Sequence, residues 1–113
     1  MLAGHADYVS KYPIATKRLM RALLKAVDLC SSSPKLVAKQ LADDKFVDQY
    51  EYALEMLKDV RYDRWREFDP EDTMRFYALR LQETGLIKMD PQEIISKGTD
   101  WRILDELKRE LKT

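Results

Sequence analysis

One long stretch of the chain is apolar over more than half of its helical circumference. Residues 13–32 read PIATKRLMRALLKAVDLCSS, and proline suits the first position of a helix, where its missing N–H costs nothing. The interior has no glycine or further proline and is rich in good helix formers. The polar residues return at helical spacing on one stripe: Lys17, Arg18, Arg21, Lys25 and Asp28. The pattern predicts a central helix that is covered on two sides, by other elements or by a missing partner.

The remaining segments predict shorter helices, three of which begin at a proline and two of which end at a glycine. No segment alternates apolar and polar residues with a period of two, so the prediction is all-α. We expect about five or six helices around residues 13–32, in a single helical segment over 1–113. Residues 1–4 are expected to be either a frayed end or the stub of a strand. The expected helical segments are 5–12, 34–43, about 48–59, 70–84, 91–98 and 99–112.

Local signals predict how these helices begin and end. Asp48 with Glu51, and Asp90 with Glu93, match the capping box, in which two side chains bond to the free N–H groups of the first turn. Asp69 before a proline is a further cap, and Thr99 is expected to cap the last helix. Gly85 is expected to end its helix in a left-handed conformation. Between helices, Phe46 and Phe68 are expected to insert into the core.

Composition excludes several classes of protein. Lys plus Arg number 20 and Asp plus Glu number 20, and this neutral balance argues against a dedicated nucleic-acid binder. Cys30 is the single cysteine and cannot form an internal disulfide. Residues 1–4 are too short for a signal peptide and lack a charged start. Taken alone the sequence indicates a cytoplasmic protein, whereas in a fragment the missing signal carries no information.

Catalytic equipment is sparse, so we expect no enzyme, no catalytic residue, no metal and no cofactor. His5 is the only histidine and has no cysteine or carboxylate at metal spacing, which favours a loop or cap role. Cys30 lies in the apolar helix without a neighbouring histidine and is expected to behave as a small hydrophobe. The acidic residues from Asp69 to Asp72 are explained by favourable charge at a helix start.

The most unusual stretch is RYDRWREF, residues 61–68, in which cations alternate with aromatics. Such side chains can stack on a base or hold an anionic ligand. The competing interpretation is a loop held by Tyr62, Trp65 and Phe68 in the core, with its arginines paired to neighbouring acids. Trp65 and Arg66, together with His5, are therefore the ligand-binding candidates, and no ligand is assigned.

Several segments resemble one family of transport proteins. They are YPIATKRLMRALLKAVDLC, then YDRWREFDPEDTMRFYALRLQETGLIK, then the turn over 91–98 and GTDWRILDELKREL. Together they are similar to the C-terminal third of periplasmic substrate-binding proteins of ABC transporters, of the nitrate/sulfonate/taurine and thiamine-precursor-like type. The resemblance covers residues 3–112.

The resemblance implies a fragment of a larger, exported protein. Members are about three times as long and fold as two α/β lobes that close on a small ligand and present it to a membrane permease. The implied location is the periplasm, and the implied partners are the ligand and the permease. One side of the helix over 13–32 would face a sheet absent from this chain. The ligand residues would lie mostly upstream, so none is carried over.

A second hypothesis belongs to another class of protein. The same apolar surface suits a stand-alone helical interaction or oligomerisation module, which would cover that surface by self-association. Under either hypothesis the isolated chain is expected to dimerise or to exchange helices.

Overall fold

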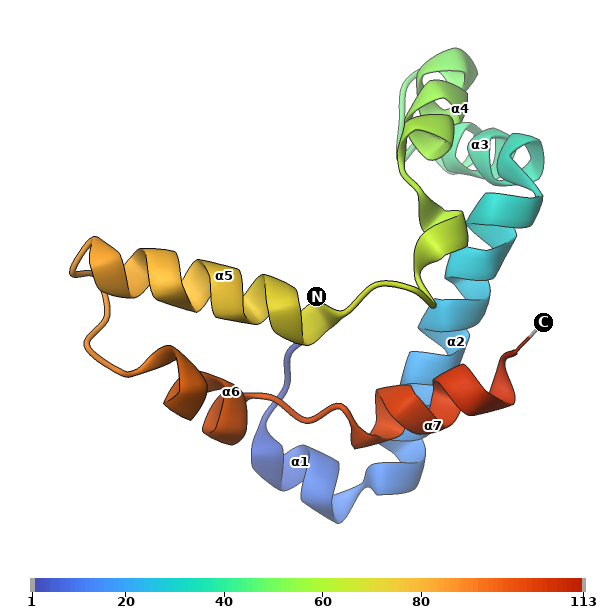
Figure 1. The fold of residues 1–113 in the computed structure, drawn as a ribbon. Helices are drawn as coiled ribbons and strands as arrows, with labels where there is room; N and C mark the ends of the chain where they lie inside the picture. The colour runs from blue at the N-terminus through green and yellow to red at the C-terminus, as the bar shows by residue number, and fades with distance from the viewer. Residues whose placement is uncertain (1, 113) are drawn as a thin grey trace.

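The chain is all-helical over residues 2–112, the range that the computed structural model describes (Figure 1). The all-α prediction is confirmed: seven α-helices are present over the described residues, α2 and six others. Residues 2–4 lie outside these helices, and Met1 lies outside the described residues. The elements are α1 (Ala6–Lys11), α2 (Pro13–Ser32), α3 (Pro34–Asp43), α4 (Tyr50–Asp59), the 3-10 turn η1 (Tyr62–Arg64), α5 (Pro70–Glu83), α6 (Pro91–Gly98) and α7 (Arg102–Glu110).

Helix α2 is central, with the bounds that the sequence predicts. It contacts α1, α3, α4, η1 and α7, which lie along its length (Figure 1). Only Thr16 of α2 is buried, and its hydroxyl donates to the carbonyl of Tyr12 at 2.8 Å. The side chain of Leu23 is 44% exposed. The centrality of α2 is therefore one of position, because neighbouring helices cover only part of its apolar surface.

The main buried cluster lies between α3 and α4. It consists of Ala38, Ala53 and Leu57, and Cys30 and Tyr62 pack against it. Two of its three members are alanines, whose small side chains let the two helices approach closely. Ala53 and Leu57 of α4 are both buried, as their four-residue spacing on one face of a helix requires. The cluster is small for a chain of 113 residues.

Helices α5 and α6 form a separate hairpin that projects from the rest of the molecule (Figure 1). They pack mainly on each other, and Ala78 and Ile95 are buried between them. The carboxylate of Asp69 accepts a hydrogen bond from the N–H of Glu71 at 2.9 Å, so the predicted cap of α5 is confirmed.

Two helices end in the same hydrogen-bonded motif. After α5, Gly85 has φ +77°, as the sequence predicts, and the N–H of Leu86 donates to the carbonyl of Leu81 at 3.0 Å. After α3, Lys45 takes the same place with φ +62°, and the N–H of Phe46 donates to the carbonyl of Leu41 at 2.9 Å. Lysine is disfavoured there because its Cβ crowds the backbone in the left-handed region.

Two expected core residues lie outside the core. Phe46 follows the left-handed Lys45 and is 77% exposed, and Phe68 is 54% exposed. Both predictions were wrong for the same reason. Phe46 lies in the bend after α3 and Phe68 in the irregular segment before α5, and the path of each link, set by the adjoining helix ends, leaves the side chain largely exposed.

Three expected helix caps are also absent. Helix α4 begins after Gln49, so Asp48 lies outside its first turn. Asp90 precedes α6, but its side chain makes no cap bond, and Glu93 pairs with Lys97 at 2.7 Å. Thr99 donates to the carbonyl of Ile95 at 2.6 Å and so closes α6 instead of opening α7. In each case a competing local bond or a later helix start replaces the expected cap.

The left-handed residue after α3 gives a prediction about stability. We expect Lys45→Gly to stabilise the chain by up to about 1 kcal/mol, because glycine adopts positive φ without a Cβ clash. The matched control is Gly85→Ala, which should destabilise by about 1 kcal/mol, since no atom lies within 4 Å of a Cβ placed there and only the conformation is penalised. Urea unfolding of both variants measures this, and equal signs would contradict the assignment.

Candidate functional site

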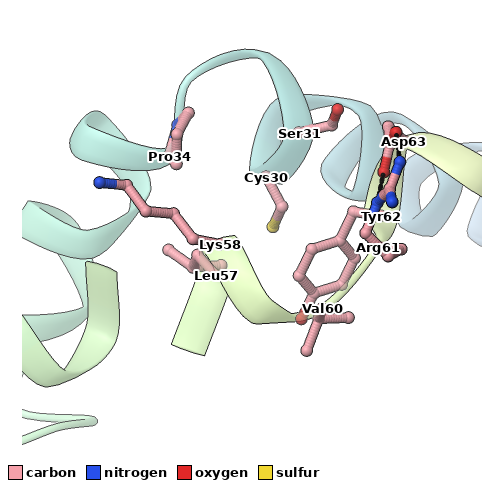
Figure 2. Close-up of a pocket in the computed structure, with 9 residues that line it drawn as sticks. All are labelled: Cys30, Ser31, Pro34, Leu57, Lys58, Val60, Arg61, Tyr62 and Asp63. Atoms are coloured by element: carbon pink, nitrogen blue, oxygen red, sulfur yellow. Dashed lines mark hydrogen bonds and ion pairs between the residues drawn. The ribbon is translucent and has the colours of Figure 1, made fainter. Parts of the chain in front are cut away.

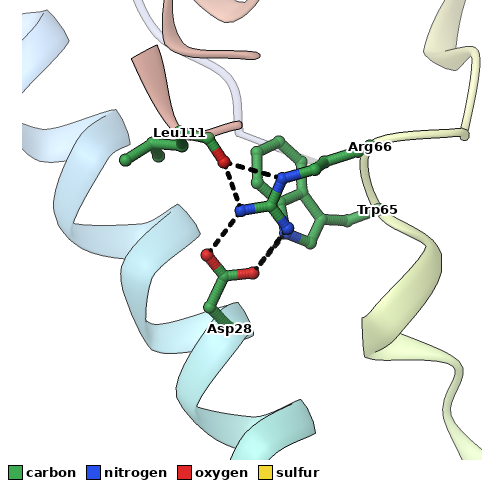
Figure 3. A network of polar contacts seen from close by, with 4 residues as sticks. All are labelled: Asp28, Trp65, Arg66 and Leu111. Atoms are coloured by element: carbon green, nitrogen blue, oxygen red, sulfur yellow. Dashed lines mark hydrogen bonds and ion pairs between the residues drawn. The ribbon is translucent and has the colours of Figure 1, made fainter. Parts of the chain in front are cut away.

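The densest polar network joins α2, the segment after η1 and the end of α7 (Figure 3). The two terminal nitrogens of Arg66 donate to the two carboxylate oxygens of Asp28, both at 2.8 Å. The Nε and one terminal nitrogen of Arg66 also donate to the carbonyl of Leu111, at 2.9 and 2.6 Å. The indole N–H of Trp65 donates to Asp28 at 2.8 Å. We call these four residues the Asp28 clasp.

The clasp is electrostatically matched. The guanidinium carbon of Arg66 lies 4.3 Å from the centre of the Trp65 ring, a cation–π contact. The hydrogen bonds from Arg66 and then from Trp65 lower the pKa of Asp28, whereas partial burial opposes this. The carboxylate of Asp28 in turn raises the pKa of Arg66. Both groups therefore remain charged at neutral pH, and each satisfies the other.

Within the clasp, two of the predicted ligand residues, Trp65 and Arg66, already have most of their hydrogen-bond donors occupied. A guanidinium has five N–H groups, and Arg66 makes four hydrogen bonds within the chain. The same guanidinium lies over the ring of Trp65. Trp65 and Arg66 thus lie together, as residues of one binding site would. Their hydrogen bonds, however, connect three segments of the chain and leave little room for an anionic ligand.

The third candidate lies at the start of another helix. His5 precedes α1 at its N-cap position, and its side chain makes no cap bond. The imidazole is exposed and forms no hydrogen bond or ion pair within residues 2–112. Asp28 is the functional partner that sequence reasoning missed. It lies 38 residues before Arg66, and no local signal links two residues so far apart.

A second charged contact holds α7 on α2. Lys17 lies 3.0 Å from Glu106 and 2.6 Å from Glu110, and Arg21 lies 2.9 Å from Glu110. Hydrogen bonds from these two cations lower the pKa of Glu110 to about 2. Of the four cations on the polar stripe of α2, two, Lys17 and Arg21, are therefore neutralised within the chain.

A shallow hollow lies where α2 and α3 meet the end of α4 (Figure 2). Its volume is about 310 Å³, it opens widely to solvent, and the thiol of Cys30 points into it. Burial raises the pKa of Cys30, which makes the thiol a poor nucleophile, and Asp63 is already bound to Arg61 at 2.7 Å. The hollow has no pair of groups suited to acid–base or nucleophilic chemistry.

A second hollow, of about 380 Å³, lies where the chain enters α5 beside α7. The indole nitrogen of Trp101 nearby is shielded from solvent and has no hydrogen-bond partner among residues 2–112. Two of the four carboxylates that line this hollow have other roles: Asp69 caps α5, and Glu71 pairs with Arg75 at 3.2 Å. We assign no ligand to it.

Over 2–112 no three histidine, cysteine or acidic side chains are grouped as a metal ion requires. None of the helices in that range is long and apolar enough to cross a membrane. Comparison with known proteins found no matching family model, no matching curated protein and no matching solved structure.

The clasp predicts an unequal response to two arginine substitutions. We expect Arg66→Ala to destabilise the chain by about 1–3 kcal/mol, because it leaves a partly buried carboxylate and carbonyl without their donors. The control is Arg61→Ala, which removes an exposed ion pair to Asp63 and should cost less than about 0.5 kcal/mol. A double-mutant cycle with Asp28→Asn isolates the pairwise coupling in urea unfolding, and a coupling near zero would refute the clasp.

The α2–α7 contact predicts a dependence on pH. The folded-state pKa of Glu110 is lowered from 4.5 to about 2, so its contribution to stability is complete above about pH 4.5 and is lost as the pH falls towards 2. Carboxyl titration by NMR should place the wild-type transition near pH 2, and Lys17→Ala should move it towards 4.5. Glu110→Gln should flatten the loss of stability over this interval. A wild-type transition at 4.5 would show that the contact does not form.

Proposed function

We propose that this chain is the C-terminal helical part of a solute-binding protein of an ABC transporter. Such a protein would deliver a small organic molecule or anion in the periplasm to a membrane permease. The observation that carries the proposal is the uncovered apolar surface along α2, taken together with the resemblance of residues 3–112. The role of this part is non-catalytic.

The size of the exposed surface supports a missing partner. The chain exposes 8883 Å², whereas a compact protein of 13.3 kDa exposes about 6,400 Å². Its radius of gyration is 17.1 Å, against about 13 Å for a compact domain of this length. The excess of roughly 2,400 Å² is as large as the area buried in a stable protein interface.

In the central helix α2, part of this excess exposed surface is apolar. Leu19, Leu23 and Leu29 of α2 are 51%, 44% and 43% exposed. In the proposed parent protein the remainder of the lobe would lie against this side of α2. The chain would then contribute stability to that lobe and part of the surface that docks on the permease. The two hollows open to solvent and no ligand is assigned to either, so the ligand contacts would come from the rest of the parent.

The same surface also favours a second candidate function, a stand-alone helical interaction or oligomerisation module. Exposed apolar patches of this extent mark interaction sites on soluble proteins. Light scattering coupled to size-exclusion chromatography tests this second candidate, because a module of this kind self-associates. A monomeric, well-folded chain of 113 residues would count against the module.

A calorimetric screen tests the proposed function directly. The longer parent protein consists of this chain together with whatever α/β-coding sequence lies upstream of it in the source gene. That protein should bind one member of a panel of small organic molecules and anions. The chain of 113 residues alone should bind none of them. A natural start codon at Met1 with no α/β-coding sequence before it, or a longer product that binds nothing in the panel, would overturn the proposal.

A pair of leucine substitutions tests whether the exposed side of α2 is covered in the longer parent protein. In the chain of 113 residues, we expect Leu23→Ala to cost less than about 1 kcal/mol, because much of its side chain is already exposed. In the longer parent the same change should cost about 2–5 kcal/mol, as for a packed core. The control is Leu107→Ala, which is fully buried in the chain itself and should cost about 2–5 kcal/mol in both proteins. Equal costs of Leu23→Ala in the two proteins would contradict coverage.

A further inference from the structure

The exposed side of α2 has a regular pattern of small and large apolar residues. All six members are exposed and lie on one side of the helix; we call them the seam: Ala15, Leu19, Ala22, Leu23, Ala26 and Leu29. Five of them follow the alternating four- and three-residue spacing of a coiled-coil interface, and Leu23 lies beside that line. The alanines leave room for another backbone to approach closely, which favours a helix as the covering element.

One border of the seam carries positive charge that the chain does not neutralise. Arg18 and Lys25 lie seven residues apart along that border, and both are exposed. Within residues 2–112 neither forms an ion pair, whereas Lys17 and Arg21 on the other side of the stripe pair with acids of α7. Two unpaired cations beside an apolar seam call for carboxylates on the surface that covers it.

We propose that the seam is covered by an acidic amphipathic helix. Its apolar side would pack on the alanines and leucines, and its carboxylates would lie opposite Arg18 and Lys25. The inference rests on the proposed function, because it names the chemistry of the parent's element that lies against α2. The proposed covering element is a helix, whereas the resemblance implies a sheet on this side of α2. The spacing of the seam favours the helix, because it matches helix packing.

Two other occupants fit the seam less well. A second copy of α2, packed antiparallel about Ala22, would place Arg18 of each copy near Lys25 of the other, and like charges repel. An anionic lipid surface suits the charges, but half of the seam is alanine and none of it is aromatic, so it offers little apolar area to insert.

Two designed peptides test the proposal on the full chain. Both are helices of about 20 residues with the same leucine and alanine seam, and they differ only in carrying glutamate or lysine along its border. We expect calorimetry to show that the glutamate peptide binds at least about tenfold more tightly than the lysine peptide. Arg18→Glu combined with Lys25→Glu should reverse that preference.

The matched control is Lys35→Glu combined with Lys39→Glu, which makes the same change of charge at exposed positions of α3. This variant should keep the preference for the glutamate peptide. Ala22→Glu, at an exposed position, should abolish binding of both peptides while the helical circular dichroism stays unchanged.

Four results would overturn the inference. They are binding of neither peptide, a preference that Arg18→Glu with Lys25→Glu does not reverse, a dimer that Ala22→Glu converts to monomer, and tighter binding to phosphatidylglycerol vesicles than to the glutamate peptide. The small-molecule screen on the parent does not involve the seam. Its failure therefore overturns the proposed function, whereas failure of the peptide test overturns only this inference.

Discussion

The Asp28 clasp is the contact on which the arrangement of the helices most depends. Few side chains are fully buried, so apolar packing alone does not fix how the segments lie. Arg66 bonds at once to α2 and to the end of α7, two elements far apart in the sequence. Directional, charge-assisted bonds of this kind define geometry where a small core cannot. The pairing of Lys17 with Glu106 and Glu110 holds the second half of α7 on α2 in the same way.

Local chemistry made most of the helices predictable, because prolines and glycines act over a few residues. The bounds of α2 and α3, the cap at Asp69 and the left-handed Gly85 all follow from such signals. The clasp did not follow, because a pairing across 38 residues leaves no periodic trace. Phe46 failed for a related reason. Its apolar character indicates burial, but the turn at Lys45 determines where it points.

The candidate site illustrates the limit of reading chemistry from residue type. An arginine next to a tryptophan suits an anionic ligand equally well as an internal carboxylate, and sequence cannot choose between them. In the structure Asp28 occupies the guanidinium, so the same residues act as a tie. The interpretation of residues 61–68 as a loop held by Tyr62, Trp65 and Phe68 is therefore the better one. It needs two corrections: Phe68 is exposed, and Arg66 pairs with a distant acid.

The uncovered side of α2 is better explained as an interface than as an ordinary surface. Solvated faces of helices are usually polar, and scattered apolar residues on them need no explanation. The seam is neither polar nor scattered, since its six residues continue along one side of the helix. The other side of α2 is satisfied within the chain, by the clasp and by α7. The internal contacts of α2 lie on one side of the helix and its other side is continuous and apolar, and on this asymmetry rests the proposal that another element covers it.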